Sequence, residues 1–427
     1  DIRKKILYTL MILVIVRVGS LLPIPGVDTE YFSSLLSGIN TGDLSYLSAF
    51  TGGSFERMSL FALSITPYIT SSIIMQLLAI AIPKLEEMQK EGEDGRKKIA
   101  AITRYVTIAL ALIESIAMAV GFGRSGLIKG YQGFSTLHYI VSIIVVVAAL
   151  TAGSAMLMWL GERITENGVG NGISIVLLIN IISGMPSDFA TLYSTFVAPR
   201  TIAKGVLAAA IIIAILVVMV VLVCFLQDGE RRIPVQYSQK VSGRKTFGGQ
   251  STNIPLKVNT AGVMPVIFAS SLMQFPVIIA QLFGKSYEWT RYLSSSYWCR
   301  ISAPKYSIGL ILYIVLLIIF AYFYTSITFN PIEVADNLKK AGGVIPGITP
   351  GKSTSDYLNN ILNYIVFVGA VGLLIIALIP IMCTGFFNAS VSFGGTSVII
   401  IGGVVLETLK QIESQMVNRY YKGFLSE

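Results

Sequence analysis

Charged residues are scarce in this chain: Asp, Glu, Lys and Arg make up only 13% of its 427 residues. A soluble globular domain normally carries about 25%. Because 54% of the residues are hydrophobic, the chain has too few polar side chains to cover a water-exposed surface. This composition excludes a soluble fold, and we expect lipid to be the main solvent of the protein.

Cysteine and histidine are also scarce, and their positions exclude several kinds of site. The cysteines Cys224, Cys299 and Cys383 are odd in number, and two of them lie in apolar runs. We interpret them as small packing residues rather than a disulfide framework. The one histidine, His138, begins an apolar run, which favours a polar cap at the membrane interface over a ligand. The sequence has no Gly-rich phosphate loop, metal-ligand cluster or nucleophile–base motif, so we expect neither a cofactor nor enzymatic activity.

Long apolar runs are what the chain has in abundance. A helix needs roughly 20 mostly apolar residues to cross the hydrocarbon core of a membrane. Ten runs approach that length, at residues 6–22, 58–83, 99–122, 137–160, 169–185, 205–226, 261–283, 306–329, 358–382 and 391–409. The first run follows three basic residues, as a signal peptide would, but it lacks a small-residue cleavage site. The sequence therefore predicts an all-α polytopic membrane protein with ten transmembrane helices.

Lys and Arg are distributed unequally between the two sets of loops. If the N-terminus is inside, the cytoplasmic stretches hold 21 of the 32 basic residues and the outer loops hold nine. An excess of positive charge marks the cytoplasmic side of a membrane protein. Both termini are therefore predicted to be cytoplasmic.

Two connections do not look like simple loops. Residues 23–57 end in a weakly apolar, Gly- and Ser-rich stretch, 44–55, which is either a surface loop or a re-entrant element sheltered by protein or a water-filled cavity. In the cytoplasmic connection 227–260, residues 231–237 alternate like a strand, residues 242–245 resemble a turn, and a second strand could begin at Thr246. The pattern predicts a basic hairpin that stands clear of the membrane.

The spans contain an internal repeat. Pro67, Met75 and Gln76 match Pro265, Met273 and Gln274 at an offset of 198 residues, and residues 172–174 match 395–397 in two of three positions. The alternative is chance similarity between apolar helices. A true repeat divides the chain into two inverted halves of five spans, at 1–200 and 201–427. Inverted repeats place the transport pathway at the interface of the halves.

Ionisable residues are few within the spans, and the repeated segments offer branched apolar residues instead. A solute pump usually carries ionisable residues deep in its spans. The candidate pathway residues are Ile65, Ile69, Ile173, Leu177, Ile267 and Ile400. One interpretation is ordinary helix packing. The other is a narrow apolar ring, which can stop ions by dewetting.

Seven short motifs in one order carry a family resemblance. They are TPYI (66–69), KEGE (90–93), GVGNGIS (168–174), RRIPV (231–235), QS and LKVN (250–251 and 256–259), NP (330–331) and VIPGI (344–348). In these motifs, and along essentially its whole length, the chain resembles the SecY family of pore subunits of the bacterial protein translocase.

The resemblance implies ten spans in two pseudosymmetric halves and assigns roles to specific residues. It implies that the six apolar residues form the pore ring, and that a plug in residues 44–55 closes the resting channel, including Leu44, Leu47, Phe50, Gly52 and Gly53. It implies a lateral gate between spans two and three and spans seven and eight, for which the candidate lining residues are Thr70, Ser71, Ser270, Ser271, Gln274 and Phe275. Docking of a motor or ribosome is expected at Arg231, Arg232, Arg244, Lys245, Lys339, Lys340 and Lys352.

The implied partners are the small membrane subunits SecE and SecG, the motor ATPase SecA, the ribosome, signal peptides, unfolded polypeptides and membrane lipid. The implied location is the bacterial cytoplasmic membrane. One position departs from the family pattern: Thr349 stands where members usually have an arginine tied to SecA-driven transport. We expect a passive, gated polypeptide channel. The alternatives are a secondary transporter for a small solute and a membrane scaffold.

Overall fold

The computed structural model describes residues 2–38, 51–91, 93–122, 136–199, 202–237, 240–242, 245–247, 251–282, 288–300, 304–387 and 395–423. A helix lies at each of the ten positions where an apolar run predicted one. In the first half these are α1 (Ile2–Leu21), α4 (Thr66–Ala81), α6 (Glu93–Phe122), α7 (Thr136–Asn167) and α8 (Gly172–Leu192). In the second half they are α9 (Ile202–Asp228), α10 (Met264–Leu282), α12 (Ile308–Thr328), α14 (Lys352–Phe387) and α15 (Gly395–Gly423).

Six of these helices are long and apolar enough to cross a membrane by length and composition: α6, α7, α8, α9, α12 and α14. The number rises to seven if α4 and the short helix α5 (Pro83–Lys90), which are bent by 106° at their junction, form one broken span. The chain is therefore a multi-pass membrane protein. The count of ten crossings stays a prediction.

The second predicted span begins later than expected. Residues 58–65 are apolar, yet they form turns, and α4 begins only at Thr66. Met58 and Ser64 adopt positive φ angles of 44° and 52°, which interrupt a right-handed helix because its residues need a φ of about −63°. Pro67 then occupies the first turn of α4, where a missing N–H costs nothing.

α4 and α10 begin at equivalent positions of the repeat. α10 begins at Met264, which is 198 residues after the first residue of α4, Thr66. Gly172 and Gly395, which the second sequence match pairs, lie in α8 and α15. The agreement between α4 and α10 favours a true repeat over chance similarity.

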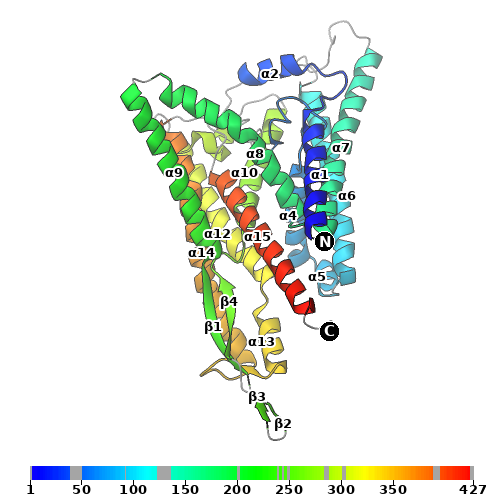
Figure 1. Cartoon of the computed structure of the whole chain (residues 1–427). Coiled ribbons are helices and arrows are strands. Elements are labelled where there is room, and N and C mark those ends of the chain that lie inside the picture. The colour runs from blue at the N-terminus through cyan, green and yellow to red at the C-terminus, as the bar shows by residue number, and fades with distance from the viewer. Residues whose placement is uncertain are drawn as a thin grey trace.

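The hairpin predicted from the sequence is present. β1 (Glu230–Tyr237) pairs antiparallel with β4 (Ser251–Lys257), and β2 (Lys240–Ser242) pairs with β3 (Lys245–Phe247) between them. Figure 1 shows this hairpin projecting from one end of the helix bundle. A third strand was not predicted: β5 (Gly343–Val344), which follows α13 (Pro331–Lys340), pairs with the end of β1.

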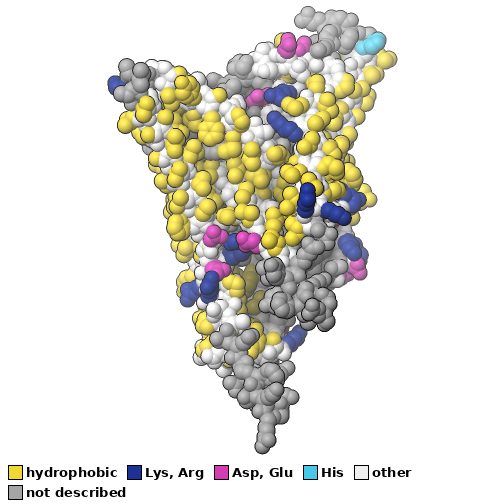
Figure 2. All heavy atoms as spheres, viewed as in Figure 1, with side chains coloured by type: hydrophobic (Ala, Val, Ile, Leu, Met, Phe, Trp, Pro, Cys, Tyr) yellow, Lys and Arg dark blue, Asp and Glu magenta, His cyan; other side chains and the backbone are white. Residues whose placement is uncertain are grey.

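The two ends of the bundle differ in structure. In Figure 1 the two termini, α5, α13 and the hairpin lie toward one end, and α2 (Thr29–Gly38) lies at the other. Near that other end, the connection between α10 and α12 contains α11 (Glu288–Leu293) and the 3-10 turns η4 (Ser295–Tyr297) and η5 (Pro304–Ser307), and α8 continues into a π-helical turn, η3 (Tyr193–Val197). Figure 2 shows hydrophobic side chains over most of the visible face between the ends.

Candidate functional site

The six predicted ring residues lie on the four helices of the repeat. Ile65, Ile69, Leu177, Ile267 and Ile400 are all buried and belong to one apolar cluster, hereafter the central cluster. Ile173 is half-buried and packs against it. The central cluster also contains side chains of α1 and α12, so it is wider than six residues. The structure thus brings the six residues into one core, and their role as a constriction stays a prediction.

A cavity of about 280 Å³ opens beside the central cluster. Its walls come from α8, α9, β4, α10, α12 and α15, so both halves of the chain contribute to it. Polar and charged side chains line it, including Asn171, Lys257, Asn259 and Glu407. Val263 lies in its wall and is also a member of the central cluster. A cavity with both polar and apolar walls therefore adjoins the central cluster, and Asn171 and Ser174 are its lining residues from the first half of the chain.

Helices of the predicted gate are in contact. α10 contacts α4 and α6, and it packs along α12 with edge-to-face contacts of Phe268 on Phe320 and Tyr324. Ser270 and Gln274 are buried, whereas Ser271 and Phe275 are half-buried. Within the described residues, none of the side-chain hydrogen bonds joins α4 or α6 to α10. Ile69 and Ile73 of α4 lie in the central cluster with Val266, Ile267 and Met273 of α10, so apolar packing contributes to this seam. Its role as a gate stays a prediction.

Two gate candidates on α4 bond within their own half. Ser71 is fully buried, and its hydroxyl contacts both the Tyr68 carbonyl and the Thr107 hydroxyl of α6. Thr70 donates to the Thr66 carbonyl at 3.1 Å. Ser71 therefore ties α4 to α6, so these two helices form one side of the seam.

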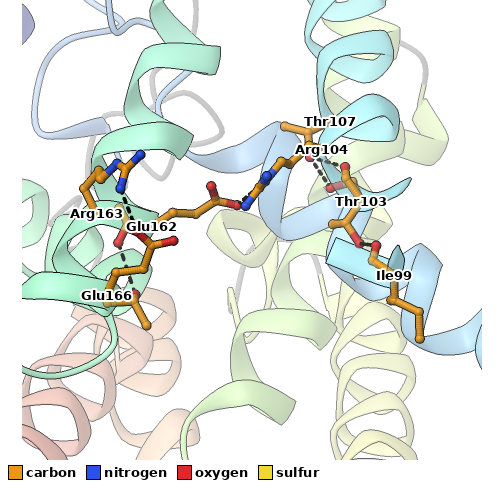
Figure 3. A network of polar contacts seen from close by, with 10 residues as sticks. Ile99, Thr103, Arg104, Thr107, Glu162, Arg163 and Glu166 are labelled. Atoms are coloured by element: carbon orange, nitrogen blue, oxygen red, sulfur yellow. Dashed lines mark hydrogen bonds and ion pairs between the residues drawn. The ribbon is translucent and has the colours of Figure 1, made fainter. Parts of the chain in front are cut away.

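An ion pair that the sequence did not reveal joins α6 to α7. Arg104 Nε lies 2.8 Å from Glu162 Oε1, and Arg163 pairs with Glu166 near it at 2.8 Å (Figure 3). Figure 3 shows Arg104 and Glu162 reaching toward each other from neighbouring helices. Arg104 lies within the apolar run 99–122 that predicted the third span. The separation of 58 residues between the two could not be inferred from local spacing.

The predicted plug is only partly described. Leu44, Leu47 and Phe50 lie outside the described residues, whereas Gly52 and Gly53 adopt positive φ angles of 62° and 78°. The stretch that follows is fixed to the C-terminal end of α1 by backbone pairing. A β-bridge joins Pro23 to Ser59, and the Leu60 N–H donates to the Leu22 carbonyl at 2.9 Å.

The predicted docking residues come from two connections that the structure joins. Arg231 and Arg232 are exposed on β1, and Lys339, Lys340 and Lys352 are exposed around α13 and the start of α14. Pairing of Gln236 with Val344 makes β4, β1 and β5 one sheet. Arg244 lies outside the described residues, as does the side chain of Lys245.

A second apolar core supports this sheet. Ile233 and Val235 of β1 pack with Leu338 of α13, Ile345 and Leu358 of α14. The alternation of residues 231–237 predicted a strand with one buried face. The alternation could not show that the connection between α12 and α14 supplies the residues that bury this face.

Thr349 takes part in the start of α14. Its hydroxyl donates to Ser353 Oγ at 2.9 Å, and its carbonyl accepts from the Thr354 hydroxyl at 2.9 Å. The residue therefore has a local structural role at the position where the family pattern has arginine.

The SecY family profile matches residues 59–409 of this chain. The chain belongs to the SecY family. It is 44% identical to a protein translocase subunit SecY of Streptomyces galbus, 42% identical to one of Halalkalibacterium halodurans and 40% identical to one of Corynebacterium glutamicum. Each of these alignments covers 100% of this chain and 97% of the relative.

Solved channels share the fold. One is a SecY protein whose plug domain stabilises the closed state of the translocation channel and maintains a membrane seal, with a TM-score of 0.68 and 18% identity. Another is Sec61 of a canine ribosome–channel complex, with a TM-score of 0.61 and 18% identity. Both alignments cover 98% of this chain and 93% of the other. Together with the family membership, this favours a protein-conducting channel over a small-solute transporter, and a channel subunit over a catalyst.

Proposed function

We propose that this member of the SecY family conducts unfolded polypeptides outward across the bacterial cytoplasmic membrane and releases apolar segments sideways into lipid. The observation that carries the proposal is the polar cavity between the two halves, which adjoins a core containing Ile65, Ile69, Leu177, Ile267 and Ile400. In this proposal these residues, with Ile173, form a ring that closes around a passing chain. Branched apolar side chains exclude ions by dewetting and bind no particular side chain of the substrate.

The lateral gate lies in this proposal at the seam of α4 and α6 with α10 and α12. The seam is held by apolar contacts, so an apolar segment of a substrate can replace them without leaving a hydrogen bond unmade. Thr70, Ser71, Ser270, Ser271, Gln274 and Phe275 are the residues we assign to its lining. The segment that contains Gly52 and Gly53 is the part of the plug that the structure describes.

The sheet of β4, β1 and β5 is the docking platform for a motor or ribosome. Exposed Arg231, Arg232, Lys339, Lys340 and Lys352 give it a positive charge that suits rRNA phosphates or an acidic protein surface. We assign SecA and the ribosome to this platform, with both termini on the same, cytoplasmic side. The largely exposed apolar faces of α1 and α9 are left for lipid and the small subunits SecE and SecG. The proposed halves meet at residues 200–201, which lie outside the described residues.

Site-specific photo-crosslinking tests the pore assignment. A photoreactive residue at position 69, 267 or 400 of the reconstituted complex should capture a stalled secretory chain. The matched control is Val217 of α9, which is 55% exposed on the outer face of the bundle. The assignment is wrong if none of the three pore positions captures the chain. Ion-coupled uptake of a small solute by the purified complex would favour the transporter instead.

A further inference from the structure

One charged side chain of α1 turns inward rather than toward water. Arg17 lies one turn before the end of α1, where an arginine can extend to the membrane surface. Its Nη1 instead donates to the Gly52 carbonyl at 3.2 Å and to the Ser183 hydroxyl at 3.0 Å. Gly52 belongs to the proposed plug and Ser183 to α8, so one guanidinium joins three elements that are far apart in sequence.

The backbone of the plug segment lies directly on α8 at this point. A Cβ on Gly52 would lie 2.6 Å from Ser183 Oγ and 2.8 Å from the Asn180 carbonyl oxygen. Because φ at Gly52 is also positive, at 62°, only glycine fits here without strain. Asn180 in turn donates from Nδ2 to Ser64 Oγ at 3.1 Å, close to the start of α4. The backbone of Gly52 therefore packs against α8 with no space for a side chain.

Some buried polar atoms of the plug segment and of α8 lack hydrogen-bond partners. Ser54 Oγ, Ser59 Oγ and Asn180 Oδ1 are buried without a hydrogen-bond partner among the described residues. Unsatisfied buried polar groups raise the free energy of the seated conformation. Phe55 and Met58 of the segment pack in an apolar core with Phe32. The polar contacts that hold the segment on α8 are thus few, and those of Arg17 are the ones made by a charged side chain.

We propose that Arg17 is a latch, a positioning residue that holds the plug segment on α8 and so sets how readily the channel opens. The inference rests on the proposed function, because it takes the segment around Gly52 as part of the plug. A bond to a charged donor is roughly twice as strong as a neutral one. Losing both bonds of Arg17 therefore favours the unseated segment, whereas a lysine can keep the charge and one bond.

Thiol labelling of the plug tests the latch in the full complex. Ser54 is 1% exposed and its hydroxyl has no partner among the described residues, so Ser54→Cys removes none of the described hydrogen bonds. With the three native cysteines replaced, a membrane-impermeant maleimide added from the outer side reports on unseating. We expect Arg17→Met to raise the labelling rate by about tenfold or more. Arg17→Lys should restore much of the protection.

Two further variants separate a latch from a general loss of structure. Arg104→Met removes another cation, whose partner Glu162 lies on α7 and not on the plug, so it should leave labelling unchanged. Ser183→Ala leaves α1 intact and should raise labelling less than Arg17→Met, with no added effect when the two are combined. Equal labelling in the Arg17→Met and parent channels would overturn the latch. So would an Arg104→Met channel that labels as fast as the Arg17→Met channel.

The same reagent distinguishes failure of the latch from failure of the proposed function. In the parent channel, a secretory chain engaged in the pore should increase labelling of the cysteine at position 54. If the engaged chain increases labelling but Arg17→Met does not, the plug is correct and the latch is wrong. If an engaged chain never increases labelling, the plug assignment itself is wrong.

Discussion

Replacing Ile400 by asparagine should weaken the closed channel. Ile400 is 0% exposed within the central cluster. Burying an isoleucine side chain contributes about 1.5–3 kcal/mol, and a buried amide without a partner costs about 1–3 kcal/mol more. We take the lower end of this sum, about 2.5 kcal/mol. At 1.4 kcal/mol per factor of ten, the ratio of open to closed channels rises roughly 60-fold.

Two assays measure this effect. Ion conductance of proteoliposomes that contain the channel without substrate should rise, and a secretory protein with a weakened signal peptide should be exported more efficiently. Ile399→Asn is the matched control, because Ile399 is 1% exposed in the same cluster but points about 100° away around α15. The reasoning fails if Ile400→Asn leaves both readouts unchanged in a folded channel. It also fails if Ile399→Asn raises them equally.

Two further predictions concern contacts outside the central cluster. Asn171→Ala should lower stability by about 1 kcal/mol, because the Asn171 side chain caps α8 by accepting from two backbone N–H groups, and Asn171→Ser should recover most of the loss in a thermal unfolding assay. Glu162→Gln should lower stability by at most about 1 kcal/mol, since its partner Arg104 is well exposed; a larger loss would show that this pair is essential to the fold.

The helices were predictable because their signal is local. Each apolar run is long enough to form a span by itself, and the basic residues beside it bias the orientation. The same applies to β1, whose alternation reveals one buried face. Where a tertiary contact overrode the local pattern, the prediction was wrong: residues 58–65 are apolar but form turns, because Met58 and Ser64 adopt left-handed conformations and the chain pairs with the end of α1.

The contacts between distant segments could not be predicted. Nothing in the local sequence of Arg17 indicates Gly52 or Ser183, which lie 35 and 166 residues away. The pairing of β5 with β1 likewise joins two separate connections, one between α9 and α10 and one between α12 and α14. Resemblance to a family supplied the expected site, but the bonds that hold it are properties of the packed chain.

Different forces hold the proposed lateral gate and the proposed plug. This difference suggests how one channel can open both toward lipid and across the membrane. At the seam of α10 with α4 and α6 the contacts are apolar, and lipid or an apolar segment replaces them at little cost. At the proposed plug, Arg17 donates to the Gly52 carbonyl, beside the backbone pairing with the end of α1 and the packing of Phe55 on Phe32. The Arg17 bond weakens when water or a polar chain competes for the same donor. An apolar segment should therefore open the seam, and a polar chain that follows it should release the plug.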